Sequence, residues 1–255
     1  MSENSLRAAD AVNPEWLPEY KKQRTALFMQ LRELNTRRFI LEKVELFPFW
    51  LFTPNSRDYV FWHTIRLSLM DTVIMIASRV IVESGKDALT LKNYKAEILR
   101  NTIDQAAKKE VLDRLQSVNF DKRVQQLESK IRNIRNNYLA HLDRLQNTLE
   151  PKERTQVGIT YDEMAELSNA AFELFYALSF ETAYSPWVEE YGDHIRATHQ
   201  TDIERLLDHV AQSSRLLHLP ERDPEHWQKC RLKLNEVDIE QINYYRKQAG
   251  LPEVS

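Results

Sequence analysis

The sequence predicts an all-α fold, and three observations lead to this prediction. Glycine is scarce, with 4 among 255 residues, whereas sheet proteins use glycine in turns and bulges. The stretch from Asn55 to Glu150 contains no proline, so long helices can run through it. Within that stretch, apolar residues recur at spacings of three and four, as they do on the buried face of a helix. We therefore expect helices joined by short loops.

The N-terminal part begins, by this prediction, with a disordered lead-in over residues 1–14. A helix is expected over residues 15–45, and Asn35 and Thr36 mark a place where it can break. An aromatic hinge follows at residues 46–52. This part thus adds one N-terminal helix to the bundle.

The next helix is the most apolar of the chain. Ser56 can cap it, and it should run to Ser84 and end at Gly85. Because it is apolar nearly all round, we expect it at the centre of the bundle, packed on several sides. Shorter helices are expected at about residues 91–101 and 103–117.

A long helix should open at Asp121 and reach about Leu149. Its apolar stripe is formed by Val124, Leu127, Ile131, Ile134, Tyr138, Leu142 and Leu145.

Two capping boxes predict the starts of later helices, because a Thr and a Glu three residues apart satisfy each other's backbone N–H groups. These pairs are Thr160 with Glu163 and Thr201 with Glu204, the second starting a helix to about residue 218. The tail from residue 223 should form two more short helices. In linear terms, we expect a helical bundle over residues 15–185, with its core at about 56–185, and a C-terminal helical extension over 186–255.

The composition excludes several classes of function. The 4 glycines lie far apart, which excludes the glycine-rich loops that bind nucleotide phosphates. A formal net charge of -3 does not by itself demand a nucleic-acid partner. Cys230 is the one cysteine, so a disulfide framework and a cysteine zinc site are excluded. No apolar run is long enough to span a membrane, and we expect a soluble, cytoplasmic protein.

One polar constellation lies on the long helix predicted from Asp121. At 100° per residue, with Arg135 at 0°, the apolar stripe covers about 260° to 340° and His141 lies near 240°. Arg135 and His141 therefore border the stripe from its two edges, while Asn136 and Asp143 lie together beside Arg135. From Asp121 to Arg144 the chain has six Lys or Arg and three acids, a local net charge of +3. This face of the helix suits a phosphate ligand.

An arginine, a histidine and an asparagine suffice for metal-free cleavage of RNA. Near neutral pH, His141 can take the proton of the 2'-hydroxyl or protonate the leaving oxygen. Arg135 offers an always-charged fork for the phosphate oxygens and for charge that develops in the transition state. Asn136 can orient the imidazole or hold a phosphate oxygen. No metal and no cofactor is expected.

The segment RNNYLAHLD, in which Arg135-Asn136 is followed by His141, resembles the signature of the HEPN superfamily. The form RNxxxAHxD, preceded by the long apolar helix, is most similar to its abortive-infection U-type branch. The resemblance covers about residues 56–185 and implies a bundle that dimerises so that two Arg/His motifs meet in one cleft. It also implies an endoribonuclease of toxin or phage-defence type, with an antitoxin or defence-system partner as a further expectation.

Other residues near the motif carry weaker expectations. Tyr138 and Asp143 are supporting candidates, although Tyr138 lies in the apolar stripe and is more typical of packing. The family members silenced by nucleotide transfer carry a Tyr two residues after the His, where this chain has Asp143, so that mode of silencing is not expected. Candidates for contacts with the RNA backbone are Lys130, Arg132 and Arg144.

Two functions from different classes follow. The first is a homodimeric, metal-independent endoribonuclease in which His141 is the general acid or base, Arg135 stabilises the phosphorane and Asn136 positions one of them. The second is a non-catalytic helical module that binds RNA, a nucleotide or a protein, in which the same residues are structural.

Overall fold

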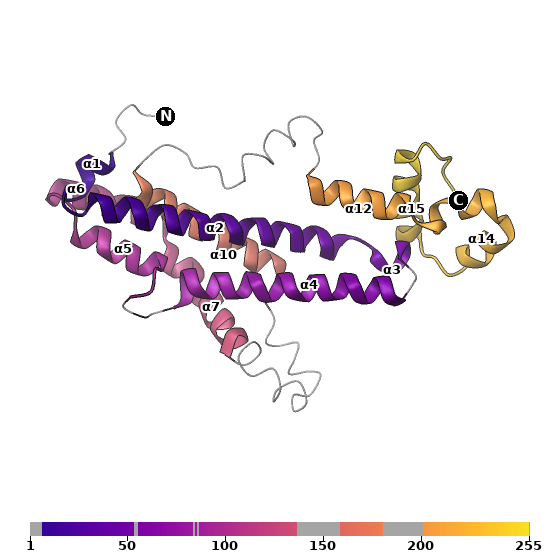
Figure 1. The fold of residues 1–255 in the computed structure, drawn as a ribbon, viewed down its shortest axis with the longest axis horizontal. Helices are drawn as coiled ribbons and strands as arrows, with labels where there is room; N and C mark the ends of the chain where they lie inside the picture. The colour runs from indigo at the N-terminus through magenta and orange to yellow at the C-terminus, as the bar shows by residue number, and fades with distance from the viewer. Residues whose placement is uncertain are drawn as a thin grey trace. The chain divides into compact units, whose positions relative to one another are not determined.

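The computed structural model describes residues 7–53, 56–83, 85, 87–136, 159–180 and 201–254 (Figure 1). Helices dominate these residues, and no β-strand occurs among them. One isolated bridge among the described residues joins Val12 to Thr102. The prediction of an all-α fold, with helices on both sides of the middle region, is therefore confirmed. No helix in the described ranges has the length and apolar character needed to cross a membrane.

The chain forms two compact units that interleave along the sequence. The first contains Met1–Phe39 and Leu69–Val188, and the second contains Ile40–Ser68 and Glu189–Ser255. This division does not follow the linear order of the three segments expected from the sequence, whose boundaries stay predictions.

The structure describes residues 7–14 of the N-terminal segment, and this part of the expected lead-in over residues 1–14 is helical in part. It contains α1 (Ala8–Ala11), in which Ala11 is fully buried. The backbone N–H of Asn13 donates to the carbonyl of Asn101 at 2.8 Å. A buried side chain and a backbone hydrogen bond therefore hold this segment in place, although the sequence around it is polar.

A single unbroken helix, α2 (Leu17–Leu46), replaces the helix expected with a break. The Thr36 hydroxyl donates to the carbonyl of Arg32 at 2.9 Å, and Arg38 donates to the Asn35 side-chain oxygen at 3.3 Å. Both polar side chains are thus satisfied within the helix itself. The Thr36 bond goes to a carbonyl four residues earlier in the same helix, a side-chain bond that leaves the helix unbroken here.

The core of the first unit forms around α10 (Tyr161–Ser179), which contacts α5 (Leu91–Arg100), α6 (Gln105–Val118) and α7 (Phe120–Ile134). The Thr160 capping box is present as predicted. Asn119 joins α6 to α7 in a left-handed conformation, with φ of 50°. Asparagine adopts this conformation more readily than most residues, so the two helices follow each other directly.

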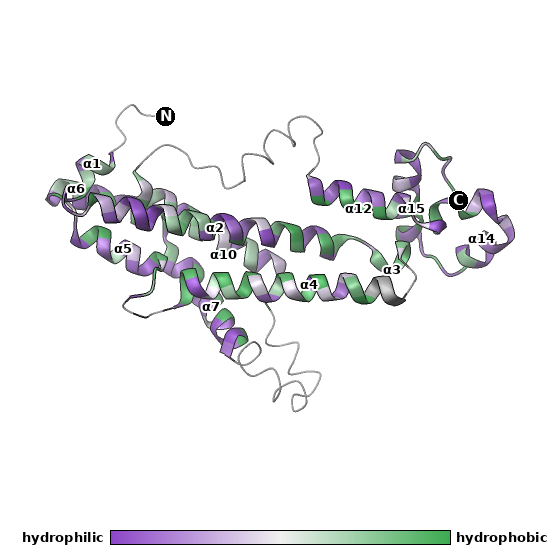
Figure 2. Cartoon of the chain, viewed as in Figure 1, coloured by the Kyte–Doolittle hydropathy of each residue, from purple (hydrophilic) through white to green (hydrophobic). Residues whose placement is uncertain are grey.

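Hydrophobic residues lie along much of α4 (Ser56–Ala77) (Figure 2), but its two halves differ in burial. Val60 and Phe61 are 61% and 57% exposed, whereas Val73 and Ile74 are buried. The expectation of packing on several sides is wrong for the first half. Exposure of apolar side chains is costly, and the prediction assumed that every side of this helix would be covered. In the described part of the chain, only the second half of α4 has neighbours on most sides.

The helix continues as a π-helical turn, η1 (Ser78–Val82), and ends before Glu83. The predicted end near Ser84 is therefore close to the observed one. The change from α to π geometry was not predicted.

The second unit contains the start of α4, the short helix α3 (Phe49–Phe52) and the C-terminal helices. These are α12 (Asp202–Gln212), η3 (Arg215–His218), α13 (Leu219–Arg222), α14 (Pro224–Arg231) and α15 (Glu236–Gln248). The Thr201 capping box is confirmed. The helix that follows ends at Gln212, because the Ser214 side chain caps a new 3-10 turn by accepting from Leu216.

A buried arginine holds the C-terminal end of this unit. Arg246 is fully buried and donates to the carbonyl of Pro252 at 2.7 Å and to that of Leu217. It also pairs with Glu221, which lowers the pKa of that carboxyl. A buried guanidinium requires such partners, so the contact connects α13, α15 and the last residues of the chain.

Candidate functional site

Arg135 follows a helix that is firmly anchored. The buried face of α7 consists of Phe120, Val124, Leu127, Ile131 and Ile134, as the spacing predicted. Beside this face, Arg123 binds Glu166 at 2.7 Å and Glu173 at 2.5 Å, both on α10. Arg135 and Asn136 continue the chain beyond α7 in π-helical conformation. The motif therefore begins at a fixed place.

The Arg135 guanidinium is held by three side chains. Its Nε donates to the Asn136 side-chain oxygen at 3.0 Å, and its Nη1 donates to the Ser78 hydroxyl at 3.0 Å. A Glu83 carboxylate oxygen lies 3.9 Å from the same Nη1. The Arg135 side chain is 29% exposed, so the group is held from one side and open to solvent on another. Among the described residues, no acceptor contacts Nη2.

Ser78 and Glu83 are contacts that sequence reasoning missed. Both belong to the end of the apolar helix, in or next to η1. A serine in an apolar helix gives little signal, because its hydroxyl can bond a carbonyl of its own helix. The signal that the sequence did offer was the position of Ser78 in a long apolar stretch, because a buried hydroxyl requires a hydrogen-bond partner.

The other described candidate residues differ in their exposure and in their side-chain partners. Arg132 precedes Arg135 by three residues and is exposed, so the two positions are neighbours on one face of the helix. Asn136 is exposed. Its side-chain oxygen accepts a hydrogen bond from Arg135, so its amide N–H groups can donate to other acceptors. Lys130 pairs with Glu163 of the α10 capping box. Its role in RNA binding stays a prediction.

The Lys130–Glu163 pair predicts a pH dependence of stability. Hydrogen bonds from Lys130 and from the Thr160 backbone lower the pKa of Glu163 from its ordinary value of 4.5. The stability that this gives is complete above pH 4.5 and is lost as the pH falls further. Because both side chains of the pair are partly exposed, solvent screens it and we expect at most about 1 kcal/mol.

Thermal unfolding measured between pH 6 and pH 3 checks this expectation. The midpoint of Glu163→Gln should fall less on acidification than that of the wild-type chain, because glutamine keeps a capping acceptor without titrating. Glu240→Gln, at an exposed glutamate of α15, should behave as the wild type does. Equal slopes for all three chains would contradict the assignment.

Four predicted site residues lie outside the described residues. They are Tyr138, His141, Asp143 and Arg144. The proximity of His141 to Arg135 therefore stays a prediction from the spacing of the motif.

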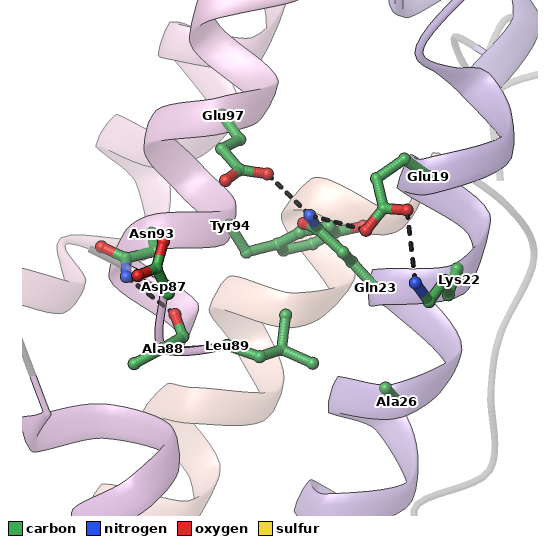
Figure 3. A pocket seen from close by; sticks show the side chains of 10 residues that line it. All are labelled: Glu19, Lys22, Gln23, Ala26, Asp87, Ala88, Leu89, Asn93, Tyr94 and Glu97. Atoms are coloured by element: carbon green, nitrogen blue, oxygen red, sulfur yellow. Dashed lines mark hydrogen bonds and ion pairs between the residues drawn. The ribbon is translucent and has the colours of Figure 1, made fainter. Parts of the chain in front are cut away.

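A pocket of about 360 Å³ in the same unit has the wrong charge for RNA (Figure 3). Gln23 donates to Glu97 at 2.7 Å and to Glu19 at 3.3 Å, and Asp87 also lines the pocket. Lys22 is the one basic side chain among the described residues that line it. Three carboxylates against one ammonium repel phosphate, so the pocket is not a site for the RNA backbone.

Over the ranges that the structure describes, no group of three or more His, Cys, Asp or Glu side chains is arranged to hold a metal ion.

A helical bundle in which an amphipathic helix leads into an Arg-Asn pair, with a His five residues beyond that Asn in the sequence, defines a HEPN domain. Within this superfamily the chain belongs to the AbiU2 family, whose model matches residues 52–198, more than half of the chain. The resemblance seen in the sequence is thereby confirmed. The matched range includes Arg135, Asn136 and His141. No curated protein and no solved structure matches the chain.

Proposed function

We propose that the chain is a metal-independent endoribonuclease of toxin or phage-defence type, acting in the cytoplasm in abortive infection. The observation that carries this proposal is the Arg135 guanidinium, held at 3.0 Å by Ser78 and at 3.0 Å by Asn136 while its Nη2 edge has no acceptor among the described residues. A fixed, partly exposed guanidinium is suited to phosphate oxygens, which it binds with two parallel N–H groups. Membership of the AbiU2 family supports the same activity.

In this mechanism, Arg135 binds the non-bridging oxygens of the scissile phosphate. His141 removes the proton of the adjacent 2'-hydroxyl, whose oxygen attacks phosphorus. The new 2'-O–P bond forms while the P–O5' bond breaks, and an imidazolium gives its proton to the departing 5'-oxygen. Arg135 stabilises the charge that develops on the phosphorane. The products are a 2',3'-cyclic phosphate and a 5'-hydroxyl.

The acid and the base of this reaction are two separate imidazoles in the simplest arrangement. A homodimer supplies both, with one motif from each copy facing one cleft, because a two-fold axis brings the same surface of each copy together. An antitoxin or another component of the defence system would restrain such an activity in the cell.

The test is cleavage of RNA by the purified full-length chain in excess EDTA. We expect cleavage to continue at an unchanged rate, since Arg135 supplies the charge that a metal would otherwise supply. The products should carry 2',3'-cyclic phosphate ends, which mass spectrometry of a short oligonucleotide detects. Loss of activity in EDTA with recovery on adding Mg²⁺ would contradict the mechanism.

The alternative is a non-catalytic module that binds RNA, a nucleotide or a protein. It predicts no cleavage of any RNA in the same assay, together with a loss of binding when Arg135 is replaced. The assay therefore separates the two functions directly.

A further inference from the structure

The end of the apolar helix changes geometry where it meets the candidate site. In an α-helix, an N–H group bonds the carbonyl four residues earlier. Here the N–H of Glu83 donates to the carbonyl of Ser78, five residues earlier, at 2.9 Å. This is the bond of a π-helical turn, which inserts one extra residue into the helix. Such single turns occur frequently at functional sites.

The extra residue decides which side chain lies above Ser78. With α-helical geometry that position would belong to Val82, which is 4% exposed and packs in the core together with Val80 and Ile81. With π geometry, Glu83 takes the position instead. The turn therefore keeps three apolar side chains buried and aligns Ser78 with Glu83 on one side.

Arg135 contacts both residues that the π turn aligns. Its Nη1 lies 3.0 Å from the Ser78 hydroxyl and 3.9 Å from the Glu83 carboxylate. The contact with Ser78 joins residues 57 apart in the sequence, and η1 packs against α7. Ser78 is only 1% exposed, so water does not replace the guanidinium as the partner of its hydroxyl.

We propose that the π turn positions Arg135 for RNA, with Ser78 and Glu83 as positioning residues that turn the Nη2 edge of the guanidinium toward the scissile phosphate. This inference rests on the proposed function, because it assigns the phosphate as the ligand of that edge. Ser78 and Glu83 touch Arg135 and not the RNA.

The two positioning residues differ in what they do. The Ser78 hydroxyl is neutral, so it fixes the orientation of the guanidinium without competing with phosphate for its charge. The Glu83 carboxylate is 42% exposed and lies beyond hydrogen-bonding distance, so solvent screens it and its effect is smaller. Ser78 therefore governs the rate of the chemical step, and Glu83 chiefly the affinity for RNA.

The first experiment replaces Ser78 with alanine in the full-length chain. We expect kcat for RNA cleavage to fall about tenfold, the value for one hydrogen bond to a charged group, while KM changes less than twofold. Ser168→Ala is the matched control, because Ser168 lies on α10, is also 1% exposed and has no hydrogen-bond partner among the described residues. It should leave both constants unchanged.

A second readout reports the position of Arg135 without any cleavage. The Nε–H resonance of Arg135, assigned by its loss in Arg135→Lys, should be sharp in the wild-type chain and broadened or shifted in Ser78→Ala. Ser168→Ala should not move it. This measurement decides the proposal even if the wild-type chain cleaves no RNA, an outcome that would refute the proposed function alone.

Three results would overturn the inference. The first is an unchanged Nε–H resonance in Ser78→Ala. The second is an equal loss of activity in Ser78→Ala and Ser168→Ala, which would indicate a merely structural serine. The third applies if Ser78→Ala does not fold, in which case Glu83→Gln, at a half-exposed position, tests the positioning role instead. It should shift the resonance and lower KM for RNA up to threefold, and no change in either would refute the positioning role.

Discussion

Replacing Arg135 with alanine is expected to lower kcat/KM for RNA cleavage about 100- to 1,000-fold, the usual effect of removing one donor to a developing oxyanion. The side chain supplies both the charge and the paired N–H groups for the phosphate. Among the described residues it contacts Ser78, Asn136 and, at 3.9 Å, a Glu83 oxygen. The variant should therefore stay folded, and a thermal melt within a few degrees of wild type would verify this.

Two matched variants separate orientation from charge. Arg135→Lys keeps the charge but loses the planar fork and the Nε donor to Asn136, so most of the loss should persist. Arg132→Ala removes an exposed guanidinium one turn earlier. It should weaken RNA binding less than tenfold and reduce the slope of log affinity against log salt by about 1. Equal losses for Arg132→Ala and Arg135→Ala would show that charge alone matters here.

Local sequence patterns predicted the elements of the fold well. The capping boxes at Thr160 and Thr201 are present because they need only residues within one turn. The buried face of α7 follows in the same way from its spacing. Burial of α4 was predicted less well, since Val60 and Phe61 are exposed. Which side of an apolar helix finds a neighbour depends on the packing of distant segments.

In the candidate site, too, contacts within one stretch of sequence could be anticipated, whereas contacts between distant segments could not. Arg135 and Asn136 could be proposed from the sequence because the motif is contiguous, and their mutual contact is local. Ser78 was not predicted, since its contact with Arg135 requires both the packing of η1 on α7 and a π turn. No periodicity in the sequence marks the one extra residue of that turn. The half of the motif that contains His141 lies beyond the described residues, so it still depends on spacing alone.

Replacing His141 with alanine is expected to lower kcat for RNA cleavage about 100- to 10,000-fold, the contribution of general acid–base catalysis by a positioned side chain. Binding should change little, because Arg135 and Arg132 still meet the phosphates. This distinguishes the variant from Arg135→Ala, which should lose both binding and rate. Fluorescence anisotropy with an RNA that lacks the attacking 2'-hydroxyl measures the binding, since that RNA is not cleaved.

The pH profile supplies an independent measure of the same residue. If two imidazoles serve as base and acid, kcat should pass through a maximum near neutral pH, since the reference pKa of histidine is about 6.5. The small residual activity of His141→Ala should lack this maximum. His226→Ala, at an exposed histidine of α14, is the control and should keep the wild-type profile. A His141→Ala chain that cleaves RNA as fast as wild type would refute the catalytic role of this histidine. In cells, wild-type expression should arrest growth, and an arrest that persists in His141→Ala would show that the toxicity has another cause.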